Sequence, residues 1–498
     1  MASKKTKSLF SGASVDSFFL LFVRLITILV SLVVTRIMSG HFSIHEYGTY
    51  SQLILLSTSL STLTILGMTD GVNYFFAKEK EEAQRSAYVS TIFFLQSIVG
   101  IITTLIVLAL TVPISIYFDN SDVKSLIVFA AIMPVLQNLI NMLQVMFMAI
   151  GKAKLIAFRN LALSILKLVS ILIACFVFDN IAVVLICQVI MEIAQVAYFI
   201  IVLKKNNCTI NILRFDVSLV REILKYCLPM GMFTVSKALN KDCDKFVVAA
   251  FTDTETLAVY TNASKYLPFE IIMGAFVTVL TPYITRYISE KMYPMVQKLY
   301  KSFLELSYIT TSTMVVGAVC VAPELMELLY TEKYLSGLNI FIIYILVEIL
   351  NVFNVTLLLC ASGKTNIVMG VGLGALVLNL CLNIAFFKLF GLMGPAFATV
   401  FVTLVQGVVI FSTSAKEIQT NIFDMFDKKF LAIFILELVG VGVFTSVIRE
   451  LILKLTLPSI ITMCICLIVY VIPLALLNFN RLKGDIKSIN SCKLQSRG

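Results

Sequence analysis

Residues 87–111 read AYVSTIFFLQSIVGIITTLIVLALT and contain no charged side chain. A helix needs about 20 predominantly apolar residues to cross the hydrocarbon core of a bilayer, so this stretch is long enough to span it. Backbone polar groups find no water in lipid, and a spanning segment must therefore be a helix or a strand of a closed barrel. The stretch lacks the alternation of apolar and polar residues that is typical of a barrel strand. It predicts a transmembrane helix.

Segments of this kind recur along the whole chain. Of its 498 residues, 59% are hydrophobic and 14% are charged, whereas a soluble domain carries about a quarter charged residues. We therefore predict an all-α polytopic membrane protein. The predicted spans number fourteen and lie at about 14–38, 46–68, 87–111, 123–150, 155–178, 181–203, 227–251, 257–284, 299–321, 336–361, 365–387, 391–413, 429–448 and 455–478.

The distribution of positive charge orients these spans. With the N-terminus in the cytoplasm, most of the 39 Lys and Arg residues fall in cytoplasmic segments. The external loops then hold six: Arg36, Lys124, Lys333, Lys388, Arg449 and Lys454. Positive residues favour the cytoplasmic side, so we expect both termini to be cytoplasmic. The net charge of +10 is explained by loops that face anionic lipid and needs no nucleic acid partner.

The longest cytoplasmic connection divides the predicted spans into two sets. We expect an N-lobe at 1–203, a cytoplasmic linker at 204–226, a C-lobe at 227–413, and a final region at 414–498 with two further spans and a tail. The linker has the pattern of a basic amphipathic helix, although a plain connection is the alternative. The fold class is thus two pseudo-symmetric six-helix lobes plus two extra C-terminal helices.

The seventh predicted span carries charges that are costly in a membrane. Lys237, Lys241 and Lys245 follow one another at every fourth residue, with Asn240 and Asp244 on the same side of the helix. Each lysine at the bilayer centre costs about 2.5–3.5 kcal/mol on insertion scales, so the set must face a wet cavity or acidic partners. A cation stripe suits a substrate that carries a diphosphate. Ion pairs that hold helices together are the structural alternative.

Three further polar residues lie within predicted spans and are candidates for substrate binding. Arg24 lies midway along the first span, and Lys167 lies in the fifth span between two serines. Asn141 belongs to a polar stripe in the fourth span, where an amide could bind sugar hydroxyls or a neighbouring helix. Pro229 and Gly231 in the seventh span, and Pro268 and Gly274 in the eighth, are either bend points or packing positions.

Short motifs give the chain a family resemblance. They are Thr35–Met38, Tyr47–Tyr50, Leu66–Asp70, Ala361–Lys364 and Gly391–Ala396. With the helix count, they resemble polysaccharide-exporting members of the multidrug/oligosaccharidyl-lipid/polysaccharide superfamily, the Wzx-type oligosaccharide-unit flippases. The resemblance implies two lobes around a central cavity, alternating access, and transport of an undecaprenyl-diphosphate-linked oligosaccharide of O-antigen, capsule or a similar polysaccharide across a bacterial plasma membrane.

The alternatives are other transporters. A drug exporter of the MATE type would share the fold but anchor cations with acids, and a lipid II flippase would carry an arginine cluster in its cavity. An enzyme is not expected, because the external loops are too short to hold a catalytic domain. No cofactor or metal site is predicted. A coupling ion, proton or sodium, is left open, and polymerase and ligase partners are implied by the resemblance alone.

Overall fold

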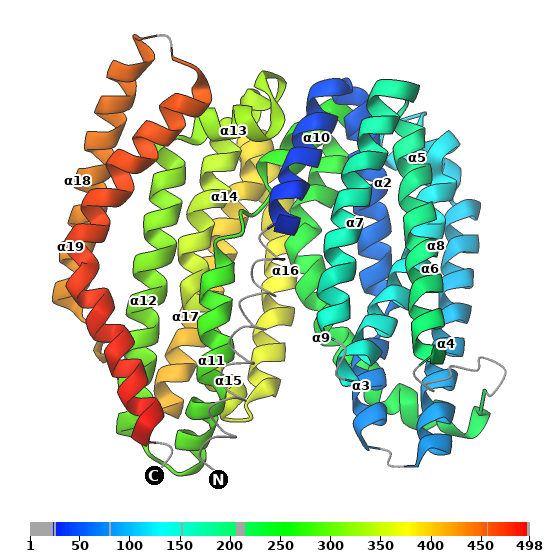
Figure 1. Cartoon of the computed structure of the whole chain (residues 1–498), viewed down its shortest axis with the longest axis horizontal. Coiled ribbons are helices and arrows are strands. Elements are labelled where there is room, and N and C mark those ends of the chain that lie inside the picture. Colours follow the sequence, from blue (N-terminus) through cyan, green and yellow to red (C-terminus); the bar gives the residue numbers. More distant parts are fainter. Residues whose placement is uncertain are drawn as a thin grey trace. The chain divides into compact units, whose positions relative to one another are not determined.

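A computed structural model describes residues 23, 26–78, 81–150, 153–205, 215–455 and 457–495 (Figure 1). These residues form helices joined by turns and short connections, and no β-strand occurs among them. Helices satisfy their own backbone hydrogen bonds, which is what a chain in lipid requires. Arg24 lies outside the described residues, as do residues 206–214 of the predicted linker.

The chain divides into two compact units. Unit 1 comprises residues 1–242 and 249–258, and unit 2 comprises residues 243–248 and 259–498. The helices up to the shared α9 are Ile26–His41, α2 (Ile44–Thr64), α3 (Met68–Lys78), α4 (Glu82–Ala109), α5 (Thr111–Tyr117), α6 (Val123–Ala149), α7 (Ala153–Ile173, continued by a π-helical turn at Ala174–Phe178), α8 (Ile181–Lys205) and α9 (Val217–Phe251). Those that follow are α10 (Thr254–Ala263), α11 (Glu270–Ser289), α12 (Tyr293–Cys320), α13 (Ala322–Tyr330), α14 (Leu338–Asn351), α15 (Leu357–Ala361), α16 (Thr365–Phe390), α17 (Gly394–Glu417), α18 (Lys428–Leu453) and α19 (Ser459–Gln495).

The chain has the helices of a multi-pass membrane protein. Within the described ranges, nine helical stretches are long and apolar enough to cross a membrane, one of which contains both α16 and α17. A tenth is the pair formed by α2 and residues Met68–Phe76, which is bent by 44°. The all-α membrane architecture is confirmed, while the count of fourteen spans stays a prediction.

Two expected spans are broken. The span predicted at 46–68 is interrupted between α2 and α3, where Leu66 and Gly67 have φ angles of 47° and 73°. Left-handed backbone of this kind ends a helix. The span predicted at 257–284 is divided between α10 and α11. Pro268 lies in the connection, and a proline disfavours helical backbone in the residue before it.

The helix α9 runs through the end of the predicted linker. It begins at Val217, with the Asp216 carboxylate accepting a hydrogen bond from the backbone N–H of Ser218. The described residues of the linker after Asp216 are thus the first turns of the same helix that carries the lysine stripe. The first part of α9 belongs to unit 1, and the division into six-helix lobes stays a prediction.

In unit 1, α9 approaches the break between α2 and α3 closely. A Cβ atom on Gly231 would lie 2.7 Å from the backbone N of Gly67, and one on Gly67 would lie 2.6 Å from the backbone N of Gly231. Glycine at both positions therefore lets the two backbones touch. An apolar core beneath this contact joins α3, α4, α6, α8 and α9; its fully buried members include Val72, Phe75, Ile92, Phe147, Phe199 and Ile223. In unit 2, α12 packs against the hairpin of α18 and α19 (Figure 1).

Candidate functional site

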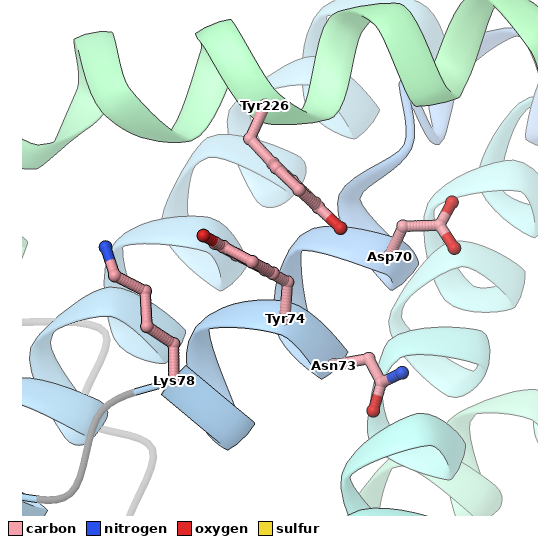
Figure 2. A pocket seen from close by; sticks show the side chains of 5 residues that line it. All are labelled: Asp70, Asn73, Tyr74, Lys78 and Tyr226. Carbon is pink, nitrogen blue, oxygen red and sulfur yellow. The ribbon is translucent and has the colours of Figure 1, made fainter. Parts of the chain in front are cut away.

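Unit 1 contains a cavity of about 450 Å³ between α3 and α9. Its lining residues are Asp70, Asn73, Tyr74 and Lys78 of α3 and Tyr226 of α9, and we refer to it as the α3 pocket (Figure 2). Its volume lies within the range of about 300–1,000 Å³ that is usual for small-molecule sites.

The register of α3 builds one wall of this pocket. Asp70, Asn73, Tyr74 and Lys78 are spaced by three and four residues, so they share one face of the helix. The opposite face carries apolar residues such as Phe75, which is fully buried in the core of unit 1. An amphipathic α3 therefore holds the polar face towards the pocket on a rigid support.

Two stacked tyrosines, Tyr74 and Tyr226, line the pocket. Figure 2 shows Tyr226 reaching from α9 towards Tyr74. Their rings are stacked, with centroids 4.2 Å apart and planes inclined by 16°. Tyr74 remains 40% exposed. An aromatic surface is thus presented to the cavity.

The positive charge of the pocket is paired. Lys78 Nζ donates a hydrogen bond of 2.9 Å to Glu222 Oε1, and the Tyr88 hydroxyl donates one of 2.6 Å to Glu222 Oε2. The Tyr88 hydrogen bond, followed by that of Lys78, lowers the pKa of Glu222, while the hydrogen bond to Glu222 raises the pKa of Lys78. Both groups are therefore charged at neutral pH and offset one another.

The other polar groups of the pocket are available to bind a ligand. Within the part of the chain that the structure describes, the side chains of Asp70, Asn73, Tyr74 and Tyr226 have no hydrogen-bond or ion-pair partner. One carboxylate, one amide and two phenol hydroxyls thus line a single cavity without being used by the protein itself.

The predicted lysine stripe lies on α9 as expected from its helical spacing, but its members differ in their surroundings. Lys241 is exposed, whereas Asn240 and Lys245 are partly buried. The backbone of Lys237 is helical, and its side chain lies outside the described part of the structure. Whether these residues bind substrate stays a prediction.

Asp244 is 3% exposed and forms a buried hydrogen-bond network in unit 2. The Tyr260 hydroxyl of α10 donates to Asp244 Oδ2 over 3.0 Å, and the Tyr344 hydroxyl of α14 donates to the same oxygen. The two hydroxyls are 3.0 Å apart, and that of Tyr344 lies 3.3 Å from Thr399 Oγ1 of α17. The network therefore joins four helices through one carboxyl group.

The remaining predicted residues lie in unit 1. Lys167 of α7 is partly buried and interacts electrostatically with Glu192 of α8, which is 7% exposed. Gln137 of α6 donates a hydrogen bond of 3.2 Å to Glu192, and Asn141, one turn further along α6, is exposed. Lys167 thus has an acidic neighbour, as expected if intramembrane charges form ion pairs that hold helices together.

The α3 pocket was not expected from the sequence. In the sequence, Asp70 stands out only as the last residue of a family motif, and the polar face that it shares with Asn73, Tyr74 and Lys78 is not predicted. Polar residues at i, i+3, i+4 and i+8 directly after a glycine turn are a signal that could have identified it. No group of three or more His, Cys, Asp or Glu residues that could hold a metal ion occurs within the described ranges.

Comparisons with known proteins identify the family and the fold in which these sites lie. A family model described as "Polysaccharide biosynthesis protein" matches residues 33–338. The structure is similar to that of the lipid II flippase MurJ in an inward closed conformation, with 15% identity, a TM-score of 0.72, and coverage of 93% of this chain and 100% of that one. No curated protein matches the chain.

Two other transporters of the MOP superfamily have a similar fold. An inward-facing multidrug resistance MATE family transporter of the MOP superfamily gives a TM-score of 0.65 at 14% identity, covering 79% of this chain and 94% of that one. A MOP superfamily transporter from Pyrococcus furiosus gives 0.58 at 14% identity, covering 82% and 94%. The chain therefore has the fold of this superfamily, and the resemblance inferred from its sequence is confirmed.

Proposed function

The chain belongs to the polysaccharide biosynthesis protein family, and on that premise we propose that it is a flippase for a lipid-linked oligosaccharide. It moves an undecaprenyl-diphosphate-linked repeat unit, of O-antigen, capsule or a similar polysaccharide, from the cytoplasmic to the outer leaflet of a bacterial plasma membrane. The observation that carries the proposal is the cationic face of α9, on which Lys237, Lys241 and Lys245 recur at every fourth residue in a chain of this family and fold.

These lysines suit the charged part of such a substrate. Ammonium groups act as mobile point charges that tolerate a passing diphosphate, and they form charge-assisted hydrogen bonds with its oxygens. Arg24 and Lys167 add cations in unit 1, and Asn240 and Asn141 offer amides to sugar hydroxyls. The polyprenyl tail remains in lipid, while rocking of two lobes exposes the headgroup to one side and then the other.

Asp244 has a different role in this mechanism. Its carboxyl group already accepts hydrogen bonds from two buried tyrosines, so it positions the second half of α9 within unit 2. Lys241 and Lys245 lie within one turn of Asp244 on the same helix.

A lipid II-type flippase is the second candidate. The similarity to the MurJ structure extends over 93% of this chain, whereas that to the inward-facing MATE family transporter extends over 79%. The two flippase functions differ in the sugar and peptide part of the headgroup, so a direct assay can separate them.

The test is leaflet exchange in proteoliposomes. The wild type is given a fluorescent polyprenyl-diphosphate oligosaccharide, fluorescent lipid II, or an organic cation inside the vesicle. The key variant changes Lys237, Lys241 and Lys245 together to Gln. The matched control changes the exposed Lys429, Lys454 and Lys483 to Gln, which removes the same charge elsewhere.

We expect the wild type and the control to exchange the oligosaccharide lipid and the triple variant of α9 to lose at least about 90% of that rate, because each charge-assisted contact contributes on the order of 1.5–3 kcal/mol. Exchange of lipid II alone would select the second candidate. Export of the cation with no lipid exchange would overturn both flippase functions.

A further inference from the structure

We propose that the α3 pocket binds a sugar ring of the transported headgroup. The inference rests on the proposed function for the identity of the substrate, and it adds a recognition site that is separate from the lysine stripe of α9. Its elements are the unpartnered polar groups of Asp70, Asn73, Tyr74 and Tyr226, the aromatic pair, and the neutralised Lys78.

The polar groups match the hydrogen-bonding capacity of a sugar. A sugar hydroxyl both donates and accepts, so its partners must offer both functions. The Asp70 carboxylate accepts, the Asn73 amide does both, and the hydroxyls of Tyr74 and Tyr226 do both. Within the ranges described, none of the four side chains uses this capacity on the protein.

The aromatic rings match the apolar faces of a sugar. The face of an aromatic ring is electronegative and attracts the electropositive C–H groups on one side of a sugar ring. Tyr74 is 40% exposed, with Lys78 Nζ 5.8 Å from the centroid of its ring, and its stacking on Tyr226 holds the ring in place. A ring that is already immobilised loses little conformational entropy when a ligand binds.

The charges of the pocket argue against a phosphate group as the ligand. Lys78 is engaged by Glu222 at 2.9 Å, and Asp70 contributes a negative charge without a cation beside it. An anion would be repelled by Asp70 and would have to compete with Glu222 for Lys78. An organic cation could use Asp70 and the ring faces, but it would leave the Asn73 amide and both hydroxyls unused. A neutral, hydroxyl-rich ring uses all of them.

The pocket is built on fixed elements. Tyr226 packs against the apolar core of unit 1, and the backbones of α9 and of the turn before α3 touch at Gly231 and Gly67. The bonds of Glu222 to Lys78 and Tyr88 tie α9 to both α3 and α4. Lys78 ends α3 immediately before the connection to α4, which the charge distribution places on the cytoplasmic side. The pocket would therefore meet the headgroup on the side where lipid-linked sugars are assembled.

A single introduced tryptophan can report binding directly. The chain contains no Trp, so Tyr74→Trp gives one fluorophore and keeps an aromatic face in the pocket. The purified full-length protein would be titrated with the glycan released from the lipid that the wild type exchanges, with a panel of soluble sugars including glucose, galactose and N-acetylglucosamine, with inorganic pyrophosphate, and with tetraphenylphosphonium.

We expect saturable fluorescence change with at least one sugar, with a Kd on the order of 1 mM or below, and none with pyrophosphate. Adding Asp70→Asn should weaken binding about tenfold or more, since a charge-assisted hydrogen bond is lost. Glu82→Gln, which removes one exposed negative charge at the start of α4, should leave it unchanged. Tyr226→Phe should retain most binding, and Tyr226→Leu should abolish it.

Three other outcomes overturn the sugar site, and a fourth overturns the flippase function instead. A response to pyrophosphate without one to sugars would make this an anion site, and a response to tetraphenylphosphonium alone would make it a cation site. No response to the glycan that the wild type exchanges would remove the sugar site while the flippase function stands. Sugar binding in a protein that exchanges no lipid would keep the site and remove the flippase function.

Discussion

Replacement of Asp244 by Leu should destabilise unit 2 by breaking one buried network. The carboxyl oxygen Oδ2 accepts from the hydroxyls of Tyr260 and Tyr344, whose side chains are 0% and 2% exposed. Leucine removes the acceptor and leaves both hydroxyls in an apolar setting. They can still bond to one another across 3.0 Å, and Tyr344 can donate to Thr399 Oγ1 across 3.3 Å, so the two hydrogen bonds to the carboxylate are replaced by neutral ones.

The size of the effect follows from these contacts. A hydrogen bond to a charged group contributes about 1.5–3 kcal/mol, and a buried donor without a partner costs about 1–3 kcal/mol. Since the tyrosine pair recovers part of this, we expect Asp244→Leu to cost about 3–5 kcal/mol. Asp244→Asn keeps an oxygen acceptor but loses the charge, so it should cost about 1–2 kcal/mol. The unfolding temperature should fall by roughly 3–5 °C for Leu and by about 1–2 °C for Asn.

Thermal unfolding in detergent can be followed with a thiol-reactive dye. Cys175, Cys227, Cys243 and Cys466 are buried free thiols that become reactive when the chain unfolds. The control is Glu450→Leu, because the Glu450 side chain is 71% exposed and should contribute less than about 1 kcal/mol. Tyr344→Phe in both backgrounds completes a double-mutant cycle, with an expected coupling of about 1–2 kcal/mol. Additive effects, or an Asp244→Leu variant that unfolds at the wild-type temperature, would refute the role assigned to the network.

Two further predictions concern unit 1. Gly231→Ala should destabilise the protein by about 1–3 kcal/mol or more, because the new Cβ would lie 2.7 Å from the backbone N of Gly67. The control is Gly440→Ala, which should be neutral or stabilising because no atom lies within 4 Å of its new Cβ. Equal unfolding temperatures for the two variants would contradict the close approach. The pKa of Glu222 is lowered from 4.5, so its carboxylate stabilises the fold above about that pH and the stabilisation is lost as the pH falls through the folded pKa. The difference in unfolding temperature between wild type and Glu222→Gln should accordingly be greatest near neutral pH and shrink below pH 4.5, and a difference that stays constant down to the acid limit would exclude this ionic contribution.

The sequence was sufficient to predict the helices and the class of protein, because apolar length alone decides whether a segment can cross a membrane. It did not predict the break at Leu66–Gly67, and it left Pro268 as either a bend point or a packing position, because a largely apolar composition continues through both sites. A glycine or proline in such a run can equally be a packing position. Gly231 illustrates this ambiguity, because its sequence context allowed a bend or a contact and the structure places the Gly67 backbone against it.

The partners of polar residues were beyond prediction for a different reason. The stripe on α9 follows from helical spacing within one segment, but Asp244 is joined to Tyr260 and Tyr344, which are 16 and 100 residues away along the chain. Tyr226 likewise meets α3 only through the tertiary fold. Helical periodicity shows which residues share a face, and it contains no information on what that face meets.

Asp244 and Asp70 differ in whether the protein supplies hydrogen-bond donors to their carboxyl groups. Asp244 and Asp70 both lie in apolar helical chain, and both would be costly there without compensation. Asp244 Oδ2 accepts hydrogen bonds from two tyrosine hydroxyls of the same unit, so the fold itself supplies donors to this carboxyl group. Asp70 has no such donor within the described ranges and lines an open cavity beside two further unpaired phenols and an amide. Because Asp70 lines an open pocket together with these unpaired groups, the α3 pocket, rather than the Asp244 network, is the site that we propose for the sugar.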